Sequence, residues 1–395
     1  MAVGGGRGGW RFPVDRPGNH TGGLRETGSS VSGTDPGAPA EAKRVRSSTG
    51  AVTDRAPRLL VTVPPRPAIE NAIAETIPDL PWAYLSRAGS QSLDRVEALL
   101  VGSPAREFGT FDPATLPRLR FVQRLFTGLD GFPFDRFPPT IPIAGNVGGY
   151  APFVAEHAVA LALGAARAIR IGADRVAAGS LRPAPFQTTL RGRTAVLLGY
   201  GAIGREIARR LEGFGIRRVG VNRSGRAVPG VEQVLPAEEI DRALAGADLL
   251  FEARPLTRAT RNSLDAARFA RMPEDAIFVN VGRAGTVVEG DLYRHLTTHP
   301  EFRAALDVWW DEDYASGRLT TAFPWASLPN LLASPHSAAI LGDAERYGVR
   351  HALANVRHVL EGGSPDHVAD RTEYAGPDSR PDTAASGSAP AQTTR

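Results

Sequence analysis

Apolar runs in the second half of the chain recur at the spacing of strands in a parallel sheet. They are residues 194–198, 217–221, 248–253, 275–281, 302–309 and 330–335. After the first run, Ile203, Ile207 and Leu211 share one face at helical spacing, which predicts an amphipathic helix behind that strand. Repeated strand–helix units of this kind predict an α/β fold, with a doubly wound parallel sheet and helices on both of its faces.

The pattern upstream of this sheet predicts a smaller α/β region. Three apolar runs bounded by proline and glycine are typical of strands, at residues 58–63, 96–102 and 119–126. Residues 153–169 then carry apolar or alanine side chains at helical spacing, with Val154, Ala158 and Leu161 on one face. This predicted helix is long enough to tie the two regions together.

The two ends of the chain have a different composition. Residues 1–56 and 376–395 are rich in glycine, serine, threonine and proline and show little apolar periodicity. Segments of this kind cannot bury enough apolar surface to offset the entropy lost on ordering. We therefore expect a disordered leader and a disordered tail.

Composition narrows the function classes. A chain of 395 residues is long enough for two domains with well-filled cores. It has no cysteine, which excludes disulfides, thiolate metal sites and a cysteine nucleophile, and no metal site is predicted. The net charge of +4 comes from basic residues spread thinly along the chain, which does not indicate a nucleic-acid partner. No apolar run is long enough to span a bilayer and the chain start lacks a secretory pattern, so we expect a cytoplasmic protein without a membrane partner.

A glycine-rich loop follows the first strand of the larger sheet. Gly199 permits a tight turn, Gly201 lets the backbone approach a pyrophosphate, and Gly204 lets the helix pack close to the strand. Ala202 and Ile203 open that helix, whose N-terminus attracts an anion. A glycine-rich turn without a ligand is the alternative. The apolar strand before the loop and the amphipathic helix after it favour a dinucleotide-binding loop.

The end of the next strand bears on the choice of cofactor. An acidic residue normally stands there and holds the ribose hydroxyls of NAD, but this strand ends in Asn222, Arg223 and Ser224. A cation with two small polar groups suits the 2′-phosphate of NADP. A solvated loop arginine is the alternative. NADP is therefore predicted as the preferred cofactor, with NAD as the second choice.

Six segments, in order along the chain, resemble the D-isomer-specific 2-hydroxyacid dehydrogenases, and glyoxylate/hydroxypyruvate reductases in particular. They are NVGGYAPFVAEHAVALAL (146–163), LRGRTAVLLGYGAIG (190–204), RPLTRATRNSLDAARFARMPEDAIFVNVGRAG (254–285), ALDVWWDED (305–313), LPNLLASPHSA (328–338) and NVRHVLEGGSPDHVADRTEY (355–374). The resemblance extends over residues 58–374. It implies a Rossmann-type dinucleotide-binding domain, residues 153–339, inserted into a smaller, discontinuous, flavodoxin-like catalytic domain, residues 57–152 and 340–375. It also implies a homodimer.

The resemblance implies Arg283, Glu312 and His336 as the catalytic set, and the chemistry suits each residue type. A 2-oxo acid offers a carboxylate and a polarised carbonyl, which the planar fork of Arg283 can bind. Hydride addition places negative charge on the carbonyl oxygen, and His336 can supply the proton because its ordinary pKa lies near neutrality. Glu312 would orient the imidazole and favour its protonated form. Because Asp311 and Asp313 flank Glu312, the acid could be displaced by one position.

The same resemblance assigns further contacts. Thr127 and Gly128 match the loop whose backbone holds the substrate carboxylate, together with Arg283. Cofactor contacts are also implied for Pro255, Val281 and Asp307, the last of them near the nicotinamide.

Other residues have structural interpretations or depart from the family pattern. His157 is expected to pack within its helix, and Trp309 and Trp310 are expected to pack in the core, although one of them could wall the substrate site. Ala284 replaces the glycine that usually follows the active-site arginine. Arg254 replaces an apolar residue, and either adds positive charge near the cofactor or lies on the surface.

These observations favour an NADP-linked reductase of 2-oxo acids such as glyoxylate or hydroxypyruvate. A second enzymatic interpretation is formate-type or phosphite oxidation. The formate enzymes that resemble this fold pair the histidine with glutamine, so Glu312 argues against formate oxidation. A third is a dinucleotide-sensing binding protein, like the corepressors that share the fold. The presence of Arg283, Glu312 and His336 favours catalysis over sensing.

Overall fold

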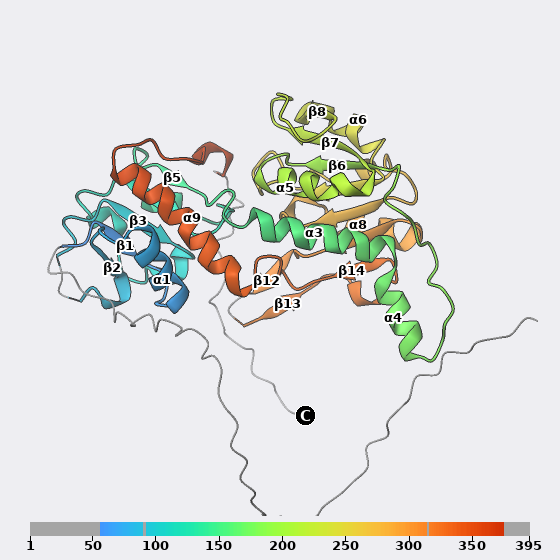
Figure 1. Ribbon diagram of the computed structural model, residues 1–395, viewed down its shortest axis with the longest axis horizontal. Helices are drawn as coiled ribbons and strands as arrows, with labels where there is room; N and C mark the ends of the chain where they lie inside the picture. The colour runs from blue at the N-terminus through green and yellow to red at the C-terminus, as the bar shows by residue number, and fades with distance from the viewer. Residues whose placement is uncertain (1–55, 90–91, 314–315, 375–395) are drawn as a thin grey trace, which may run out of the picture. The chain divides into compact units, whose positions relative to one another are not determined.

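The computed structural model describes residues 56–89, 92–313 and 316–374 (Figure 1). Two parallel sheets organise this part of the chain. The disorder predicted for the leader and for the tail falls outside the described residues, apart from Ala56.

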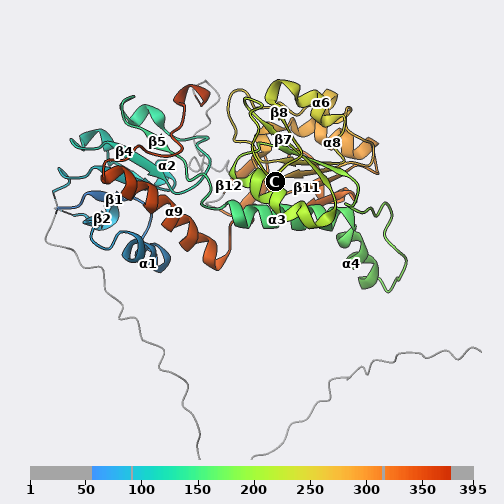
Figure 2. The same cartoon turned by 45° about the horizontal axis from the view of Figure 1, so that its top comes forward.

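The smaller sheet has five strands in the order β2-β1-β3-β4-β5, and all neighbouring strands are parallel. The strands are β1 (Leu59–Val61), β2 (Trp82–Tyr84), β3 (Ala98–Val101), β4 (Phe121–Arg124) and β5 (Ile143–Ala144). This order is the flavodoxin-like one, as the sequence predicts. One face of the sheet packs against α1 (Pro67–Thr76) and α9 (Gly342–Leu360), which lie side by side (Figure 1, Figure 2). Because α9 follows the second sheet in the sequence, the smaller unit is built from two separate stretches of chain.

The larger sheet has seven parallel strands in the order β14-β11-β10-β9-β6-β7-β8. They are β6 (Thr194–Leu198), β7 (Arg217–Asn222), β8 (Gln233–Pro236), β9 (Leu249–Glu252), β10 (Ile277–Asn280), β11 (Arg303–Leu306) and β14 (Leu331–Ala333). Read from β8, the strand order is that of the dinucleotide-binding Rossmann fold with one strand added. The direction of winding reverses between β6 and β9, which is where such folds bind their ligands.

Helices cover both faces of the larger sheet, as its apolar pattern predicts. Ala195 and Leu197 of β6 face the core formed with α3 (Ala151–Ala166) and α5 (Ala202–Leu211). The alternate residues Val196 and Leu198 face the opposite core, which also takes side chains from the remaining helices. These are α6 (Ile240–Leu244), α7 (Ala266–Phe269) and α8 (Glu289–Thr298).

Shorter elements complete the fold. The helix α2 (Pro104–Glu107) is a single turn, and β12 (Asp311–Asp313) pairs antiparallel with β13 (Arg318–Thr320). The 3-10 turns are η1 (Leu85–Arg87), η2 (Pro113–Thr115), η3 (Phe134–Arg136), η4 (Glu212–Phe214), η5 (Ala237–Glu239), η6 (Ala284–Thr286), η7 (Trp325–Ser327) and η8 (Arg371–Glu373). The β12–β13 hairpin is not predicted from the sequence because its residues are polar and largely exposed.

The helix predicted over residues 153–169 is in fact two helices. α3 ends at Ala166, and α4 (Ile169–Ala177) begins after Ala168, whose backbone is left-handed with φ of 47°. Within the described residues no single helix is long and apolar enough to cross a membrane; only α3 and α4 taken together reach that length and composition, and they are bent by 59°.

Candidate active site

The glycine-rich loop forms the turn from β6 into α5. Gly199 has φ of 89°, and a Cβ on it would lie 2.9 Å from the backbone of Ala253 and Arg254, so only glycine fits. A Cβ on Gly204 would lie 2.6 Å from the carbonyl oxygen of Gly199, so glycine at this position allows the helix to approach the end of the strand closely. Gly201 faces open space and caps α5 without a side chain, so no side chain of the loop occupies the N-terminus of this ten-residue helix. The loop therefore fits a pyrophosphate.

The residues predicted to hold the 2′-phosphate lie at the end of β7 and just beyond it, but two of them bond to their own loop. The side-chain amide of Asn222 donates to the carbonyl of Arg226 at 2.9 Å, and Asn222 Oδ1 accepts from the backbone N–H of Ser224 at 3.1 Å. Ser224 Oγ accepts from the N–H of Arg226 at 3.3 Å. Asn222 and Ser224 thus shape the loop, and Arg223 is the residue whose side chain reaches out, with 80% of it exposed.

Arg223 has a partner that the sequence does not predict. Its Nη2 lies 2.6 Å from Oε1 of Glu373, which belongs to η8 near the end of the described chain. Residues 223 and 373 are far apart in the sequence and no local pattern connects them.

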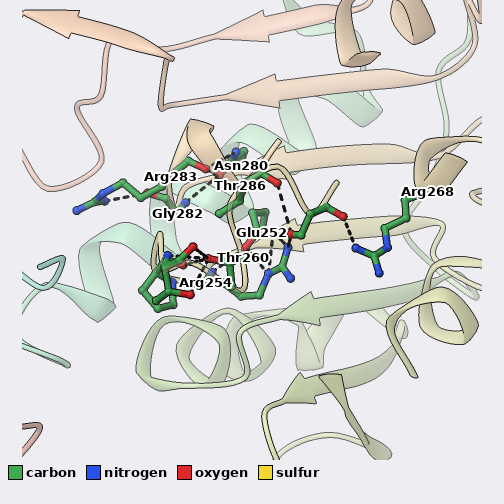
Figure 3. Close-up of polar contacts among 11 residues, drawn as sticks. Glu252, Arg254, Thr260, Arg268, Asn280, Gly282, Arg283 and Thr286 are labelled. Atoms are coloured by element: carbon green, nitrogen blue, oxygen red, sulfur yellow. Dashed lines mark hydrogen bonds and ion pairs between the residues drawn. The ribbon is translucent and has the colours of Figure 1, made fainter. Parts of the chain in front are cut away.

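Arg254 is mostly buried, so its interpretation as a surface residue is wrong, and a carboxylate compensates its charge beside the dinucleotide loop. Its Nε lies 3.0 Å from each carboxylate oxygen of Glu252, and its Nη2 donates to Ser263 Oγ at 3.0 Å. Glu252 is fully buried at the end of β9, so the two charges balance each other inside the protein. Figure 3 shows Arg254 turned toward Glu252, whereas Arg283 points away from this pair.

Arg283 lies beyond the end of β10 and faces the loop that follows β4. Its Nε donates to both carboxylate oxygens of Asp130 at 3.1 Å. A Cβ on Gly128 would collide with the Arg283 guanidinium, so the glycine is what lets the arginine lie against this loop. Thr127 belongs to the same loop and its hydroxyl donates to the carbonyl of Asn146 at 3.1 Å. The structure therefore brings together all three residues predicted to bind substrate.

Asp130 is a member of this cluster that sequence reasoning missed. Burial by itself would raise the pKa of its carboxyl, but Arg283 and Arg124 outweigh that effect and hold the pKa below its ordinary value. Asp130 thus stays ionised and fixes the direction of the Arg283 side chain. Its position two residues after Gly128 is the signal that could have identified it.

The predicted histidine–acid pair is formed. His336 Nδ1 lies 2.9 Å from both carboxylate oxygens of Glu312, which also accepts from the backbone N–H of Trp309 at 2.9 Å. Asp313 instead binds Ser316, and Asp311 is exposed, so Glu312 is the acid that meets the histidine. His336 has φ of 51°, a left-handed backbone that a non-glycine residue seldom adopts. With Nδ1 held by the carboxylate, Nε2 is the ring nitrogen that can face a substrate.

Asp307 organises the turn that carries His336. Its carboxylate, only 1% exposed, accepts from Ser334 Oγ at 2.6 Å and from the backbone N–H groups of Ser337 and Ala338 at 2.9 and 3.1 Å. Nε2 of His157, on α3, lies 3.3 Å from Asp307 and 3.0 Å from Ser334 Oγ. Burial would raise the pKa of Asp307, but these hydrogen bonds hold it below its ordinary value.

The remaining predicted residues support this arrangement. Trp309 is buried and donates from Nε1 to the carbonyl of Ser334 at 2.9 Å, while Trp310 stacks on Trp325 with ring centres 5.3 Å apart. Both tryptophans pack, as expected. Val281 is buried at the end of β10 and Pro255 is exposed beyond the end of β9. Among the described residues, no group of three or more acidic, histidine or cysteine side chains could hold a metal ion.

Comparison with known proteins agrees with this geometry. Residues 159–338 match the NAD binding domain of the D-isomer specific 2-hydroxyacid dehydrogenases. Glyoxylate/hydroxypyruvate reductase B of Citrobacter koseri is 30% identical over 254 residues, which are 62% of this chain and 76% of that protein. A proposed formate dehydrogenase from Pyrobaculum aerophilum is 30% identical, with a TM-score of 0.67 over 80% of this chain and 100% of that one.

A third relative was solved with a nicotinamide cofactor. The D-isomer specific 2-hydroxyacid dehydrogenase of Xanthobacter autotrophicus Py2, in complex with NADPH and MES, is 25% identical, with a TM-score of 0.68 over 80% of this chain and 98% of that one. The chain belongs to the D-isomer specific 2-hydroxyacid dehydrogenase family. It is thus an oxidoreductase that uses a nicotinamide dinucleotide, as the sequence predicts.

The contact between Gly128 and Arg283 yields a test of the substrate-side cluster. In Gly128→Ala the new methyl group must push the guanidinium away from Asp130, because no space remains between them. A displacement of about 1 Å can cost about 10²-fold in rate, so kcat/KM for a 2-oxo acid should fall by about that factor. The melting temperature should change little, since a flexible side-chain end can move.

Gly246→Ala is the matched control, because a Cβ at that position meets nothing within 4 Å. If Gly128→Ala kept the kinetics of the wild type, Arg283 would not depend on its present position for catalysis.

Proposed function

We propose that this enzyme is an NADPH-linked reductase of small 2-oxo acids, such as glyoxylate or hydroxypyruvate. The observation that carries the proposal is the His336–Glu312 pair, with Nδ1 2.9 Å from the carboxylate. His336 follows β14 of the larger sheet, in which β10 precedes Arg283 and β6 precedes the dinucleotide loop. The name of the Citrobacter koseri relative supports the substrate class, and the NADPH complex of the Xanthobacter autotrophicus relative supports the cofactor.

Arg283 binds and orients the substrate in this proposal. Asp130 holds its Nε, and its Nη1 donates to the carbonyl oxygen of Gly282 at 2.9 Å, so the guanidinium is fixed in one plane. A planar guanidinium held in this way suits the carboxylate and carbonyl oxygens of the acid. The backbone of Thr127 and Gly128 holds the same carboxylate from the other domain. Two points of attachment fix the carbonyl carbon in one orientation, which is what a directed hydride transfer requires.

His336 supplies the proton. A bound reduced nicotinamide would supply the hydride for the carbonyl carbon of the substrate. Negative charge then develops on the carbonyl oxygen, and Nε2 of His336 gives it a proton, so the product is the 2-hydroxy acid. Glu312 accepts from Nδ1–H throughout, which keeps Nε2 directed at the oxygen and stabilises the protonated ring.

The cofactor-binding residues follow the sheet edge. We assign the pyrophosphate to Gly199, Gly201, Ala202, Ile203 and Gly204, and the 2′-phosphate to Arg223 in the loop shaped by Asn222 and Ser224. Pro255 and Val281 contact the cofactor at the ends of β9 and β10, and Asp307 lies near the nicotinamide. Asp307 and Val281 follow strands that end at the same edge as β6.

The other functions remain less well supported by the site. Formate oxidation is the activity in the name of the Pyrobaculum aerophilum relative, but Glu312 holds the histidine here, where formate enzymes of the family use glutamine. A purely sensing protein would have no need for the Asp130–Arg283 and Glu312–His336 pairs, each of which holds a catalytic group in a fixed direction.

The domain limits and assembly belong to the same proposal. Residues 57–152 and 340–375 form the catalytic domain and residues 153–339 the dinucleotide-binding domain, in a cytoplasmic homodimer. Exposed apolar side chains on and just after α4, namely Ile169, Val176 and Leu181, are 61%, 64% and 93% exposed, and support a dimer contact there.

Turnover with a panel of acids tests the function directly. Oxidation of NADPH should proceed with glyoxylate and hydroxypyruvate at a kcat on the order of 1 s⁻¹ or higher, as for ordinary enzymes. Formate and phosphite with NADP⁺ serve as the opposing arm. No NADPH oxidation with any 2-oxo acid, or faster oxidation of formate, would contradict the proposal.

Replacement of Arg223 tests the cofactor preference. Arg223→Ala should raise the Kd of NADPH by about tenfold and change that of NADH little, because a charge-assisted hydrogen bond at an exposed site contributes roughly 1.5 kcal/mol. Arg226→Ala is the control, since Arg226 is an exposed arginine of the same loop. Equal losses for both cofactors, or a wild type that prefers NADH, would show that Arg223 does not bind the phosphate.

A further inference from the structure

Glu373 lies across the adenosine end of the proposed cofactor site. Its side chain pairs with Arg223, in the loop after β7, and its carbonyl oxygen accepts from the backbone N–H of Arg258, in the loop after β9, at 3.0 Å. β7 and β9 are the two neighbours of β6 in the sheet. A single residue from the catalytic domain thus contacts the loops on both sides of the dinucleotide turn.

The position of Glu373 is fixed independently of Arg223. The neighbouring Arg371 donates to four carbonyl oxygens of the loop between β4 and β5, those of Phe134, Phe137, Pro138 and Ile141, at 2.6 to 3.3 Å. Tyr374 stacks on Phe134 with ring centres 5.6 Å apart, and the carboxylate of Asp370 accepts from the N–H of Thr372 at 2.9 Å. The segment is therefore anchored on both sides of Glu373, whose carboxylate is held where Arg223 can reach it.

We propose that Glu373 determines how strongly the enzyme discriminates between NADPH and NADH. Glu373 supplies, from the far end of the chain, a carboxylate at the site where β7 has none. A 2′-phosphate that binds Arg223 must displace this carboxylate and is repelled by it, whereas NADH leaves the Arg223–Glu373 pair intact. Glu373 thus weakens NADPH binding selectively and brings the two affinities closer together.

The inference rests on the proposed function, because it takes Arg223 as the 2′-phosphate ligand. The size of the effect follows from exposure: the Arg223 side chain is 80% exposed and that of Glu373 is 24% exposed. An ion pair this exposed, together with screened repulsion of the phosphate, corresponds to a change in Kd of about fivefold. Because the interaction is between exposed charges, the effect should shrink as salt is raised.

Glu373→Gln in the full-length protein tests the inference, with the Kd of NADPH and of NADH measured at low and high salt. The variant keeps the backbone contact to Arg258 and removes only the charge. We expect NADPH to bind about fivefold more tightly at low salt, NADH to bind within twofold of the wild type, and the gain to diminish at high salt. In the double variant with Arg223→Ala the gain should disappear, because the arginine with which Glu373 pairs is gone.

Glu361→Gln is the matched control for the change in net charge, since Glu361 pairs with Arg357 on the surface of α9. An unchanged NADPH affinity in Glu373→Gln, or a parallel change for both cofactors, would overturn the role of Glu373. If Arg223→Ala nevertheless weakened NADPH, the proposed function would stand without it. If Arg223→Ala left NADPH unaffected, the phosphate site itself would be wrong.

Discussion

The geometry of the active site depends on the buried carboxylate of Asp307. A charge placed in the interior is costly unless donors surround it, and Asp307 has its donors in Ser334, Ser337, Ala338 and His157. Three of them belong to the turn that carries His336, and the fourth belongs to α3. These hydrogen bonds fix the backbone of the turn on both sides of His336, which stabilises the positive φ of that residue. Loss of the carboxylate would free the turn and, with it, the direction of the histidine.

The same rule governs the other charges at the carboxyl edge of the larger sheet. Glu252 is fully buried and meets Arg254, and Asp130 meets Arg283. The first pair supports the backbone behind the dinucleotide loop, where a Cβ on Gly199 or on Gly282 would lie only 2.9 Å from backbone atoms of Arg254. The second fixes the substrate-side arginine. Each functional group is thus held by a charge that has no part in the chemistry.

Sequence and structure agree where the determining interactions are local or carry a family motif. The apolar run 194–198 became β6 without change, and Gly199, Gly201 and Gly204 took the predicted turn. The strands β2, β5 and β8 were not predicted because they are short strands at sheet edges, and β2 and β8 are only partly buried, so none of them carries a long apolar run. The exposed strands β12 and β13 have no apolar pattern. The break after Ala166 was missed because alanines continue the helical pattern across it.

The site residues that escaped prediction are those defined by a distant partner. Asp130 has one local signal, its position two residues after Gly128, but its pairing with Arg283 has none, and Glu373 is recognisable only opposite Arg223. The sequence separations of 153 and 150 residues carry no periodic signal. The surface interpretation of Arg254 failed for a similar reason. Its side chain is held inside by Glu252, a charged residue at the end of an apolar strand, and the apolar pattern gives no sign of this pair. A sequence motif identifies a candidate functional residue, whereas the fold determines which charged side chain lies beside that residue.

The kcat of His336→Gln at saturating NADPH and 2-oxo acid tests the central claim most directly, with the Kd of NADPH measured beside it. Glutamine keeps the polarity of the site but cannot give up a proton as imidazolium does. If His336 is the proton donor, kcat should fall by about 10²–10⁴-fold while NADPH binds as in the wild type, because the dinucleotide loop is untouched. A kcat within tenfold of the wild type would show that the proton comes from another group, and the mechanism derived from the His336–Glu312 pair would be wrong.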